Sequence, residues 1–312
     1  MAINRIEIKD FLVFKGEFAL DFCPGVNVLI GGNGTGETTL LKYLYESKKV
    51  VMKFESKHSY AVATFEDNTL IIKEESNAYI ESNKGGNVIS ESKIANLIYI
   101  PEKDILEHAK GLLPFIDQKP TGFSRIYRDV IVSAQDIPTK NQSETQKKIG
   151  ETITGIIGGY IEWVQSEGSF YTVRTDGVRI PFSSEASGFK KLGFLGLLVA
   201  SGQLEPGAVL FWDEPENSLN PELVPILVDV LLELSRNGVQ IFLATHSEIL
   251  ASYFSVNREK CDVVMFYSLY KDGEHIKADK SDRFDLLVPN NLTLEPVRLY
   301  ERKPERGLGG NG

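Results

Sequence analysis

The chain has 312 residues, 42% of them hydrophobic and 25% charged, so it can bury a core large enough for one large domain or two lobes. No apolar run approaches the roughly 18 residues that span a bilayer, and the N-terminus has no signal-peptide pattern, which predicts a cytoplasmic protein without a membrane partner. Cys23 and Cys261 are too few and too far apart for a disulfide framework or a zinc site, and a net charge of -9 argues against coating nucleic acid by charge alone.

The first thirty residues predict a small antiparallel sheet that leads into a central strand. Residues 3–8 alternate apolar and polar side chains, as a half-buried strand does, and residues 11–22 are extended and rich in phenylalanine. After a Pro24-Gly25 turn, residues 26–30 form the continuous apolar run that is typical of a buried strand.

A glycine-rich loop, residues 31–39, separates that strand from an apolar helical pattern that begins at Leu40. A strand, a glycine loop and a helix form the context of a phosphate-binding loop, because glycines let backbone N–H groups approach phosphate oxygens and the helix points its positive end at them. The Thr38 hydroxyl stands where this pattern places a Mg²⁺ ligand. The candidate phosphate-binding residues are Asn33, Gly34, Thr35, Gly36, Glu37, Thr38 and Thr39.

One residue of the loop departs from the pattern G-x-x-x-x-G-K-[ST], because Glu37 stands where the pattern has lysine. That lysine reaches the β- and γ-phosphates, so a carboxylate in its place replaces attraction with repulsion. At a few Å and an effective dielectric near 20, each unit-charge interaction is roughly 4 kcal/mol. The alternative is a glycine-rich turn that binds no nucleotide, and the loop alone does not decide between the two.

The middle of the chain predicts further strands and then a helical lobe. The predicted strands cover residues 50–54, 60–65, 69–73 and 94–100, with a turn at 66–68 and a hairpin or loop at 79–86. From residue 102 the pattern becomes helical, over residues 105–113, 123–133 and 153–163, with a polar, mobile-looking segment at 136–148. A hairpin with strands 164–173 and 178–182 follows. Lysine pairs such as Lys147-Lys148 and Lys190-Lys191 are predicted to be solvated.

The last part of the chain alternates helices and strands, which predicts a mostly parallel sheet. Helices are predicted over 186–201, 221–234 and 248–254, and strands over 208–212, 240–244 and 263–267. The glycine-rich tail, residues 307–312, is predicted to be disordered.

Two acids follow the apolar run 208–212 directly. A buried strand would deliver Asp213 and Glu214 to the carboxyl end of the sheet, where Asp213 can hold Mg²⁺ and Glu214 can polarise a water that attacks a γ-phosphate. A strand that ends in solvated acids is the alternative for this segment.

Two further sites complete the pattern. His246 ends the apolar run 241–245, one strand–helix unit after the acids, where it can donate to a γ-phosphate or orient the water; a lone histidine is otherwise usually structural. Small residues that include Ser187 and Gly188 begin the predicted helix 186–201, where exposed N–H groups suit an anion. Taken alone, that segment is an ordinary helix start.

Together and in this order, these segments resemble the ATP-binding-cassette ATPases of the SMC/RecF-like type, a group of AAA-family ATP-binding proteins. The resemblance covers residues 1–270. Its motifs are the Walker A loop (31–39), the Q-loop region (101–104), the signature (183–191), the Walker B strand (208–214), the D-loop (216–221) and the switch histidine (His246). It implies an α/β P-loop NTPase head of the cassette type: a mixed, mostly parallel sheet with an antiparallel β subdomain and an inserted helical lobe.

The resemblance also implies the domain organisation and the mechanism. Residues 1–101 and 202–312 would form the nucleotide-binding lobe, and residues 102–201 the helical and signature lobe. Two copies would enclose ATP and Mg²⁺ between the loop of one and Ser187 and Gly188 of the other. Thr38 and Asp213 would bind the metal, and Glu214 and His246 would catalyse hydrolysis, which releases the dimer and switches a partner effector or a DNA contact.

Three departures leave two functions open. Glu37 replaces the phosphate-binding lysine, Ala186 stands at the serine position of the signature, and the Q-loop has no glutamine, so that Glu102 or Asp104 would have to serve instead. The first hypothesis is a dimerising ATPase that Glu37 impairs, since Glu214 and His246 are retained. The second is a non-hydrolysing scaffold in a defence or DNA-repair complex. By family analogy, the effector is a separate nuclease or toxin, and DNA is a further candidate partner.

Overall fold

The computed structural model describes residues 2–46, 60–65, 69–74, 77–82, 96–118, 123–139, 141–290 and 292–293. The strands are β1 (Ile3–Phe11), β2 (Phe14–Asp21), β3 (Val26–Gly31), β4 (Tyr60–Phe65), β5 (Thr69–Glu74), β6 (Asn77–Ser82), β7 (Leu97–Ile100), β8 (Gly159–Val164), β9 (Ser169–Arg174), β10 (Arg179–Pro181), β11 (Val209–Asp213), β12 (Gln240–Thr245), β13 (Val264–Asp272) and β14 (His275–Ser281). The α-helices are α1 (Glu37–Glu46), α2 (Ala109–Gln118), α3 (Arg125–Ser133), α4 (Glu144–Ile157), α5 (Ser187–Ala200), α6 (Val224–Arg236) and α7 (Glu248–Asn257). Short 3₁₀ turns are η2 (Leu106–His108), η3 (Phe182–Ser184), η4 (Pro221–Leu223) and η5 (Phe284–Leu286).

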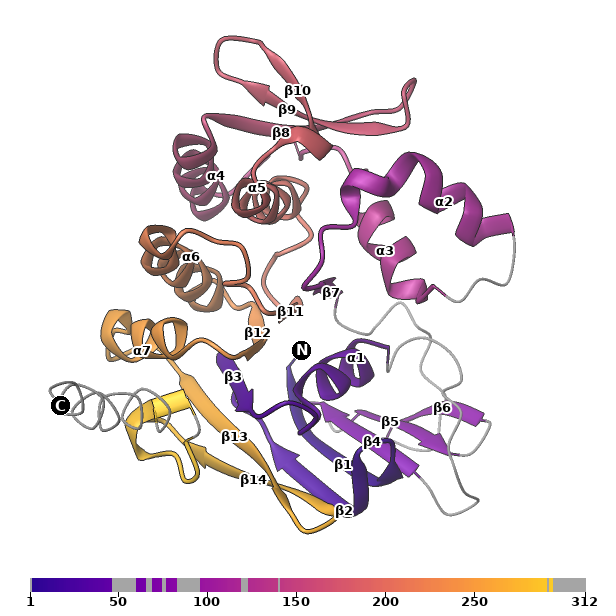
Figure 1. Ribbon diagram of the computed structural model, residues 1–312, viewed down its shortest axis with the longest axis vertical. Coiled ribbons are helices and arrows are strands. Elements are labelled where there is room, and N and C mark those ends of the chain that lie inside the picture. The colour runs from indigo at the N-terminus through magenta and orange to yellow at the C-terminus, as the bar shows by residue number, and fades with distance from the viewer. Residues whose placement is uncertain are drawn as a thin grey trace, which may run out of the picture.

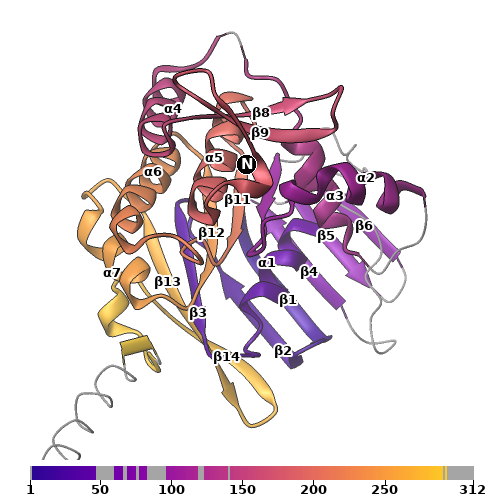
Figure 2. The same ribbon diagram turned by 45° about the horizontal axis from the view of Figure 1, so that its top comes forward.

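A six-stranded sheet in the order β14-β13-β3-β12-β11-β7 forms the centre of the molecule (Figure 1). The strands from β13 to β7 pair in parallel, and only β14 at the edge is antiparallel to its neighbour. Every residue of β3, β11 and β12 is buried. Such strands need cover on both faces, and α1 lies on one side of the sheet while α6 and α7 lie on the other (Figures 1 and 2).

A second sheet, in the order β2-β1-β4-β5-β6, is antiparallel and lies beyond α1 (Figure 1). Its first two strands form a hairpin, and the ring of Phe11 contacts that of Tyr43 on α1 at a centroid distance of 5.7 Å. Helix α1 therefore packs between two sheets, which fixes the direction in which its N-terminus points.

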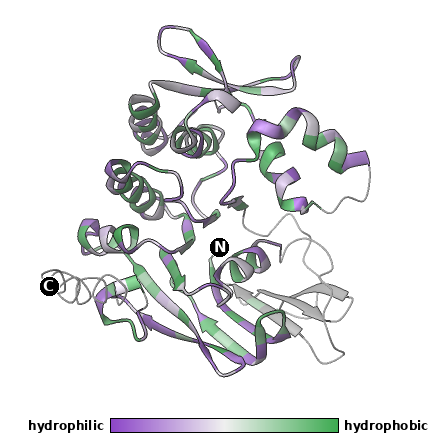
Figure 3. Ribbon diagram, viewed as in Figure 1, coloured by the Kyte–Doolittle hydropathy of each residue, from purple (hydrophilic) through white to green (hydrophobic). Residues whose placement is uncertain are grey.

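A third part of the molecule contains α2 to α5 and the three-stranded sheet β10-β9-β8 (Figure 2). Helix α5 packs closely on α4 and β8, because a Cβ at Gly193 would lie 2.6 Å from the Ile161 side chain and one at Gly196 would lie 3.1 Å from Ile153. Helices α4 and α6 carry both hydrophobic and hydrophilic residues, as expected for helices with one buried side (Figure 3). Most of α5 is buried, including Lys190 and Lys191.

The order of strands and helices predicted from the sequence is confirmed for most of the described chain. The mixed, mostly parallel sheet, the antiparallel β subdomain and the hairpins all form. Of the segment 79–86, predicted to be a hairpin or loop, residues 79–82 lie in strand β6, which pairs with β5 as a hairpin. Residues 83–86 lie outside the described residues. The predicted strand at 50–54, the turn at 66–68 and the tail at 307–312 lie outside the described residues.

Two predictions for the helical part were wrong. The polar segment 136–148 is not irregular throughout, because α4 begins at Glu144 behind a capping box formed by Ser143 and Gln146. The helix predicted over 153–163 ends at Ile157, because Gly158 adopts a left-handed conformation with φ of +64° and β8 starts directly after it. Strand β14 was not predicted, because most of its residues are polar.

Among the residues that the structure describes, no helix is both long and apolar enough to cross a membrane.

Candidate active site

The glycine-rich loop connects β3 to α1 in the conformation that only glycine adopts without strain. Gly34 and Gly36 have φ angles of +78° and +102°. A Cβ at Gly36 would lie 2.8 Å from the side chains of Val13 and Phe14, at the turn between β1 and β2. The hairpin of the antiparallel sheet thus holds the loop from one side, while Asn33 and Gly34 are exposed at its tip.

The Glu37 side chain does not extend from the loop but folds back over its base. It is 6% exposed, it contacts the Thr35 hydroxyl, and a Cβ at Gly31 would overlap its carboxylate. Burial raises the pKa of Glu37, and the hydrogen bond from Thr35 opposes that shift. The Thr35 hydroxyl also lies 2.7 Å from the Gly32 carbonyl, so its single proton cannot serve both acceptors unless Glu37 carries a proton of its own.

Thr38 and Asp213 meet directly at the start of α1. The Thr38 hydroxyl donates to Asp213 Oδ1 at 2.9 Å, and the Tyr99 hydroxyl donates to Oδ2 at 3.2 Å. Asp213 is 5% exposed, and burial raises the pKa of its carboxyl group. A hydroxyl and one carboxylate are the oxygen ligands with which proteins hold Mg²⁺ when phosphates and water complete its shell, so these two residues fit that ion.

Glu214 and His246 face each other beside the loop. His246 Nε2 lies 3.7 Å from Glu214 Oε1, and its Nδ1 lies 3.1 Å from the Gly31 carbonyl, which assigns the proton to Nδ1. Glu214 has a φ of +48°, a left-handed conformation that costs about 1–2 kcal/mol for a residue other than glycine. Burial and the nearby Glu102 raise the pKa of the Glu214 carboxyl group. The histidine thus connects the base of the loop to the acid at the end of β11.

Several residues that hold these groups were missed in the sequence. Glu216 accepts hydrogen bonds from the Thr245 hydroxyl at 2.7 Å and from the His246 backbone N–H at 3.2 Å. Lys191, predicted to be solvated, is only 4% exposed and donates to the Glu214 carbonyl at 2.8 Å. Its neighbour Lys190 is 5% exposed and pairs with Glu107. The sequence did not indicate that these lysines are buried, because their partners, Glu107 and the Glu214 backbone carbonyl, are distant in the sequence.

The acids proposed to replace the missing Q-loop glutamine lie at the edge of this site. Glu102 accepts a hydrogen bond from Asn217 at 3.1 Å, and Asn217 also reaches Glu214 at 3.5 Å. Burial raises the pKa of Asp104, which the charges of Lys190 and Lys191 oppose. Asn217 therefore links Glu102 to Glu214 by hydrogen bonds, whereas Asp104 lies near the charges of Lys190 and Lys191.

Ser187 and Gly188 lie apart from the loop. They begin α5, which is on the far side of β11 from α1 in both ribbon views (Figures 1 and 2). Ala186 occupies the N-cap without a capping side chain, Ser187 is exposed, and a Cβ at Gly188 would lie 3.1 Å from the Ser218 carbonyl. One chain therefore gathers the loop, Thr38, Asp213, Glu214 and His246, but not the two signature residues.

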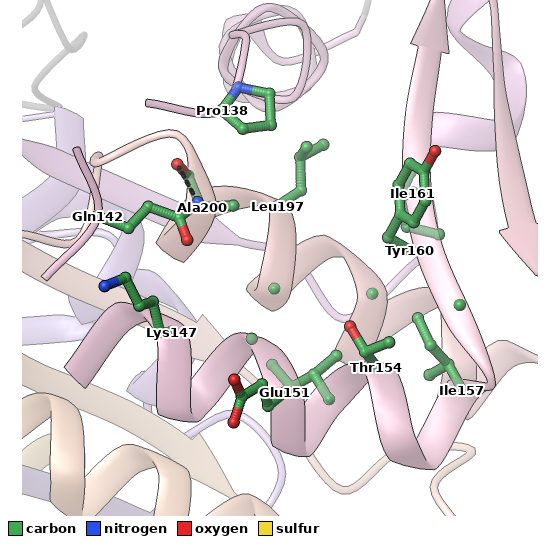
Figure 4. A pocket seen from close by; sticks show the side chains of 15 residues that line it. Pro138, Gln142, Lys147, Glu151, Thr154, Ile157, Tyr160, Ile161, Leu197 and Ala200 are labelled. Carbon is green, nitrogen blue, oxygen red and sulfur yellow. Dashed lines mark hydrogen bonds between the residues drawn. The ribbon is translucent and has the colours of Figure 1, made fainter. Parts of the chain in front are cut away.

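An apolar groove lies elsewhere on the described surface. It has a volume of about 380 Å³ and lies between α4, α5 and β8, where Ile157, Ile161 and Leu197 line it together with Tyr160 (Figure 4). Gln142 bonds to the Ala200 carbonyl at one end. It contains none of the candidate site residues.

Comparisons with known proteins identify the family and the fold of the chain. A family model described as "AAA domain, putative AbiEii toxin, Type IV TA system" matches residues 54–252, more than half of the chain. No curated protein matches the sequence. Among solved structures, the SMC head domain from Thermotoga maritima is 14% identical with a TM-score of 0.53, and covers 90% of this chain and 99% of its own.

Two further SMC heads are similar in fold. One is an SMC head bound to the C-winged helix domain of ScpA, 12% identical with a TM-score of 0.60, covering 90% of this chain and 98% of its own. The other has an extended coiled coil and is bound to the C-terminal domain of ScpA derived from Pyrococcus furiosus, 11% identical with a TM-score of 0.58, covering 95% and 99%. The chain therefore belongs to this AAA-domain family of ATPases, and its fold is that of an SMC-like P-loop head.

Proposed function

We propose that this chain binds ATP with Mg²⁺ and hydrolyses it as one half of a homodimer, and that Glu37 weakens this activity. The observation that carries the proposal is the convergence of two pairs at one edge of the sheet. Thr38 and Asp213 lie 2.9 Å apart, and Glu214 and His246 lie 3.7 Å apart beside the same loop. If Asp213 and Glu214 were only solvated acids at the end of a strand, contacts with a hydroxyl and a histidine would not be expected.

Each residue has a role in this proposal. The backbone of the loop, with the side chains of Asn33, Thr35 and Thr39, would bind the phosphates, and Thr38 and Asp213 would hold Mg²⁺, which neutralises phosphate charge when bound. Glu214, with its pKa raised, would accept the proton of the attacking water. His246 would orient that water or donate to the γ-phosphate.

The signature residues support a dimer. Ser187 and Gly188 begin α5, whereas the loop leads into α1, and α5 lies on the far side of β11 from α1 (Figures 1 and 2). In the cassette ATPases that the chain resembles, the signature of one copy faces the nucleotide of the other, and we propose the same role for Ser187 and Gly188. A lobe of residues 102–201 would then move with α5 against a lobe of residues 1–101 and 202–312. This motion is how hydrolysis would switch an attached partner.

Glu37 supports the view that the activity is impaired. Its carboxylate lies at the base of the loop, and a charge of the wrong sign about 4 Å from a phosphate oxygen costs about 4 kcal/mol at an effective dielectric of 20. The raised pKa of Glu37 reduces this cost, because a neutral side chain repels no phosphate.

The partner is proposed from the family alone. The family description names a putative toxin of a toxin–antitoxin system, which favours a role in antiphage defence over one in DNA repair with DNA as the partner. A separate effector, a nuclease or a toxin, is proposed by family analogy. The second candidate function is a scaffold that keeps the fold without hydrolysis. The buried Glu37 carboxylate and the absence of a side-chain cap at Ala186 favour it.

The test compares Mg-ATP binding and turnover by this chain with those of Glu37→Lys and of Glu37→Gln, and follows oligomeric state in the same samples. Glu37→Gln is the matched control, since it removes the charge without supplying a cation. We expect turnover and ATP-dependent dimers in Glu37→Lys, and binding that improves less in Glu37→Gln. Glu214→Gln in the Glu37→Lys background should retain binding and accumulate dimers. A Glu37→Lys chain that neither binds nor turns over ATP would exclude the ATPase and leave the scaffold.

A further inference from the structure

The loop lacks its lysine, but another ammonium group lies against it. Lys271 Nζ is 3.6 Å from the position that a Cβ would occupy at Gly34, at the exposed tip of the loop. We propose that Lys271 supplies a cation to the phosphates of a nucleotide bound at this loop, in place of the lysine absent at position 37. This inference rests on the proposed nucleotide binding and adds a binding residue that the motifs do not contain.

The sheet explains how a residue so distant in the sequence reaches the loop. Strand β13 pairs in parallel with β3, and Leu269 stands opposite Gly31, the residue at which the loop begins (Figure 1). Side chains two residues apart on a strand point to the same face. Lys271 therefore extends from the face that carries Leu269, just beyond the end of β3, which is where the loop turns back toward α1.

The charge of Lys271 is not committed to a neighbour. Within the described chain, the structure gives this exposed ammonium no carboxylate partner, whereas Lys277 in the same hairpin pairs with Asp272. Lys280 lies 3.6 Å from Asp21. An ammonium group on a flexible stem is a point charge well suited to phosphate oxygens, and it needs no fixed geometry.

The other lysines near the site are less suited to this role. Lys42, one turn after Thr38 on α1, lowers the pKa of Asp213 and so acts at the metal-binding carboxylate. Lys191 is buried and donates to the Glu214 carbonyl. Lys271 alone among these three lies at the tip of the loop and is free to move toward a ligand.

The experiment measures the dissociation constant of Mg-ATP by calorimetry at low and physiological salt. The proteins are the full chain, Lys271→Ala, Lys271→Arg, the control Lys280→Ala from the same hairpin, and Glu37→Lys. Lys271→Ala should weaken binding about tenfold at low salt and less at physiological salt, because exposed charges are screened. Lys271→Arg should recover most of the affinity, and Lys280→Ala should change it less than twofold.

Two results would overturn the inference while leaving ATP binding in place. One is equal affinity of Lys271→Ala and the unchanged chain. The other is a chain that binds no ATP while Glu37→Lys does, since Lys271 would then fail to compensate. Absence of binding in every protein, Glu37→Lys included, would instead overturn the proposed function. Lys271 is exposed, so its variants should fold, and coincident thermal unfolding curves would verify this.

Discussion

Lys191 offers the sharpest test of how Glu214, the candidate general base, is held in place. Its ammonium is buried and donates at 2.8 Å to the carbonyl of Glu214, the residue whose backbone adopts a left-handed conformation. Lys191→Met keeps the length of the side chain and removes the charge. A hydrogen bond from a charged group contributes about 1.5–3 kcal/mol to stability, net of the cost of taking the charge out of water. That same burial lowers the pKa of Lys191. We therefore expect a loss of about 2 kcal/mol in the free energy of unfolding.

The assay is urea unfolding followed by tryptophan fluorescence, because Trp212 is fully buried in β11, one residue before Asp213. The control is Lys147→Met, which removes an exposed lysine whose salt bridge, among the described residues, is with Glu144 on the surface of α4. Its unfolding midpoint should equal that of the unchanged chain. Equal stability of the two variants would refute the reasoning, because the buried hydrogen bond to Glu214 would then contribute nothing.

Three further predictions concern the loop and a helix. Burial raises the pKa of Glu37 above its ordinary 4.5, so the folded state holds this proton more tightly than the unfolded state. The stability of the folded state is therefore lost as pH rises from 4.5 through the folded pKa. Glu37→Gln should be more stable than the unchanged chain at pH 7.5 and lose that advantage at pH 4.5, as measured by urea unfolding at both values. Gly36→Ala should destabilise by about 2 kcal/mol or more in thermal unfolding, because its φ is +102° and its Cβ would meet Val13 and Phe14 at 2.8 Å. Gly155→Ala, within α4 and with no atom near its Cβ position, should raise stability by about 0.5–1 kcal/mol in the same assay; a loss would show that α4 needs its glycine for packing.

The parts of the fold that were predictable from sequence are those with a strong local pattern. The apolar run of β11 and its terminal acids, and the glycine loop after β3, identify themselves within a few residues. The end of α4 was not predictable, because apolar residues continue at helical spacing into β8 and only Gly158 marks the boundary. Strand β14 is half solvated and owes its place to pairing with β13.

The candidate site follows the same rule. Thr38, Asp213, Glu214 and His246 each lie at the end of a recognisable strand or at the start of a helix, so the sheet brings them together. Lys191 and Lys271 carry no motif, and their positions follow only from which distant residues they contact. For Glu37, the sequence predicted repulsion of phosphate but not that the carboxylate would lie folded and buried against Thr35.

The position of β3 in the sheet has a consequence for how the chain is made. This strand, which carries the loop, lies between β12 and β13, so that Val26 pairs with Ile241 and with Val264. During synthesis the apolar strand leaves the ribosome long before either neighbour exists. Its pairing, and with it the loop, must wait until most of the polypeptide has emerged. Such long-range pairing slows folding and leaves a hydrophobic strand exposed to aggregation in the meantime, so that production of this protein would depend on chaperones that cover nascent chains.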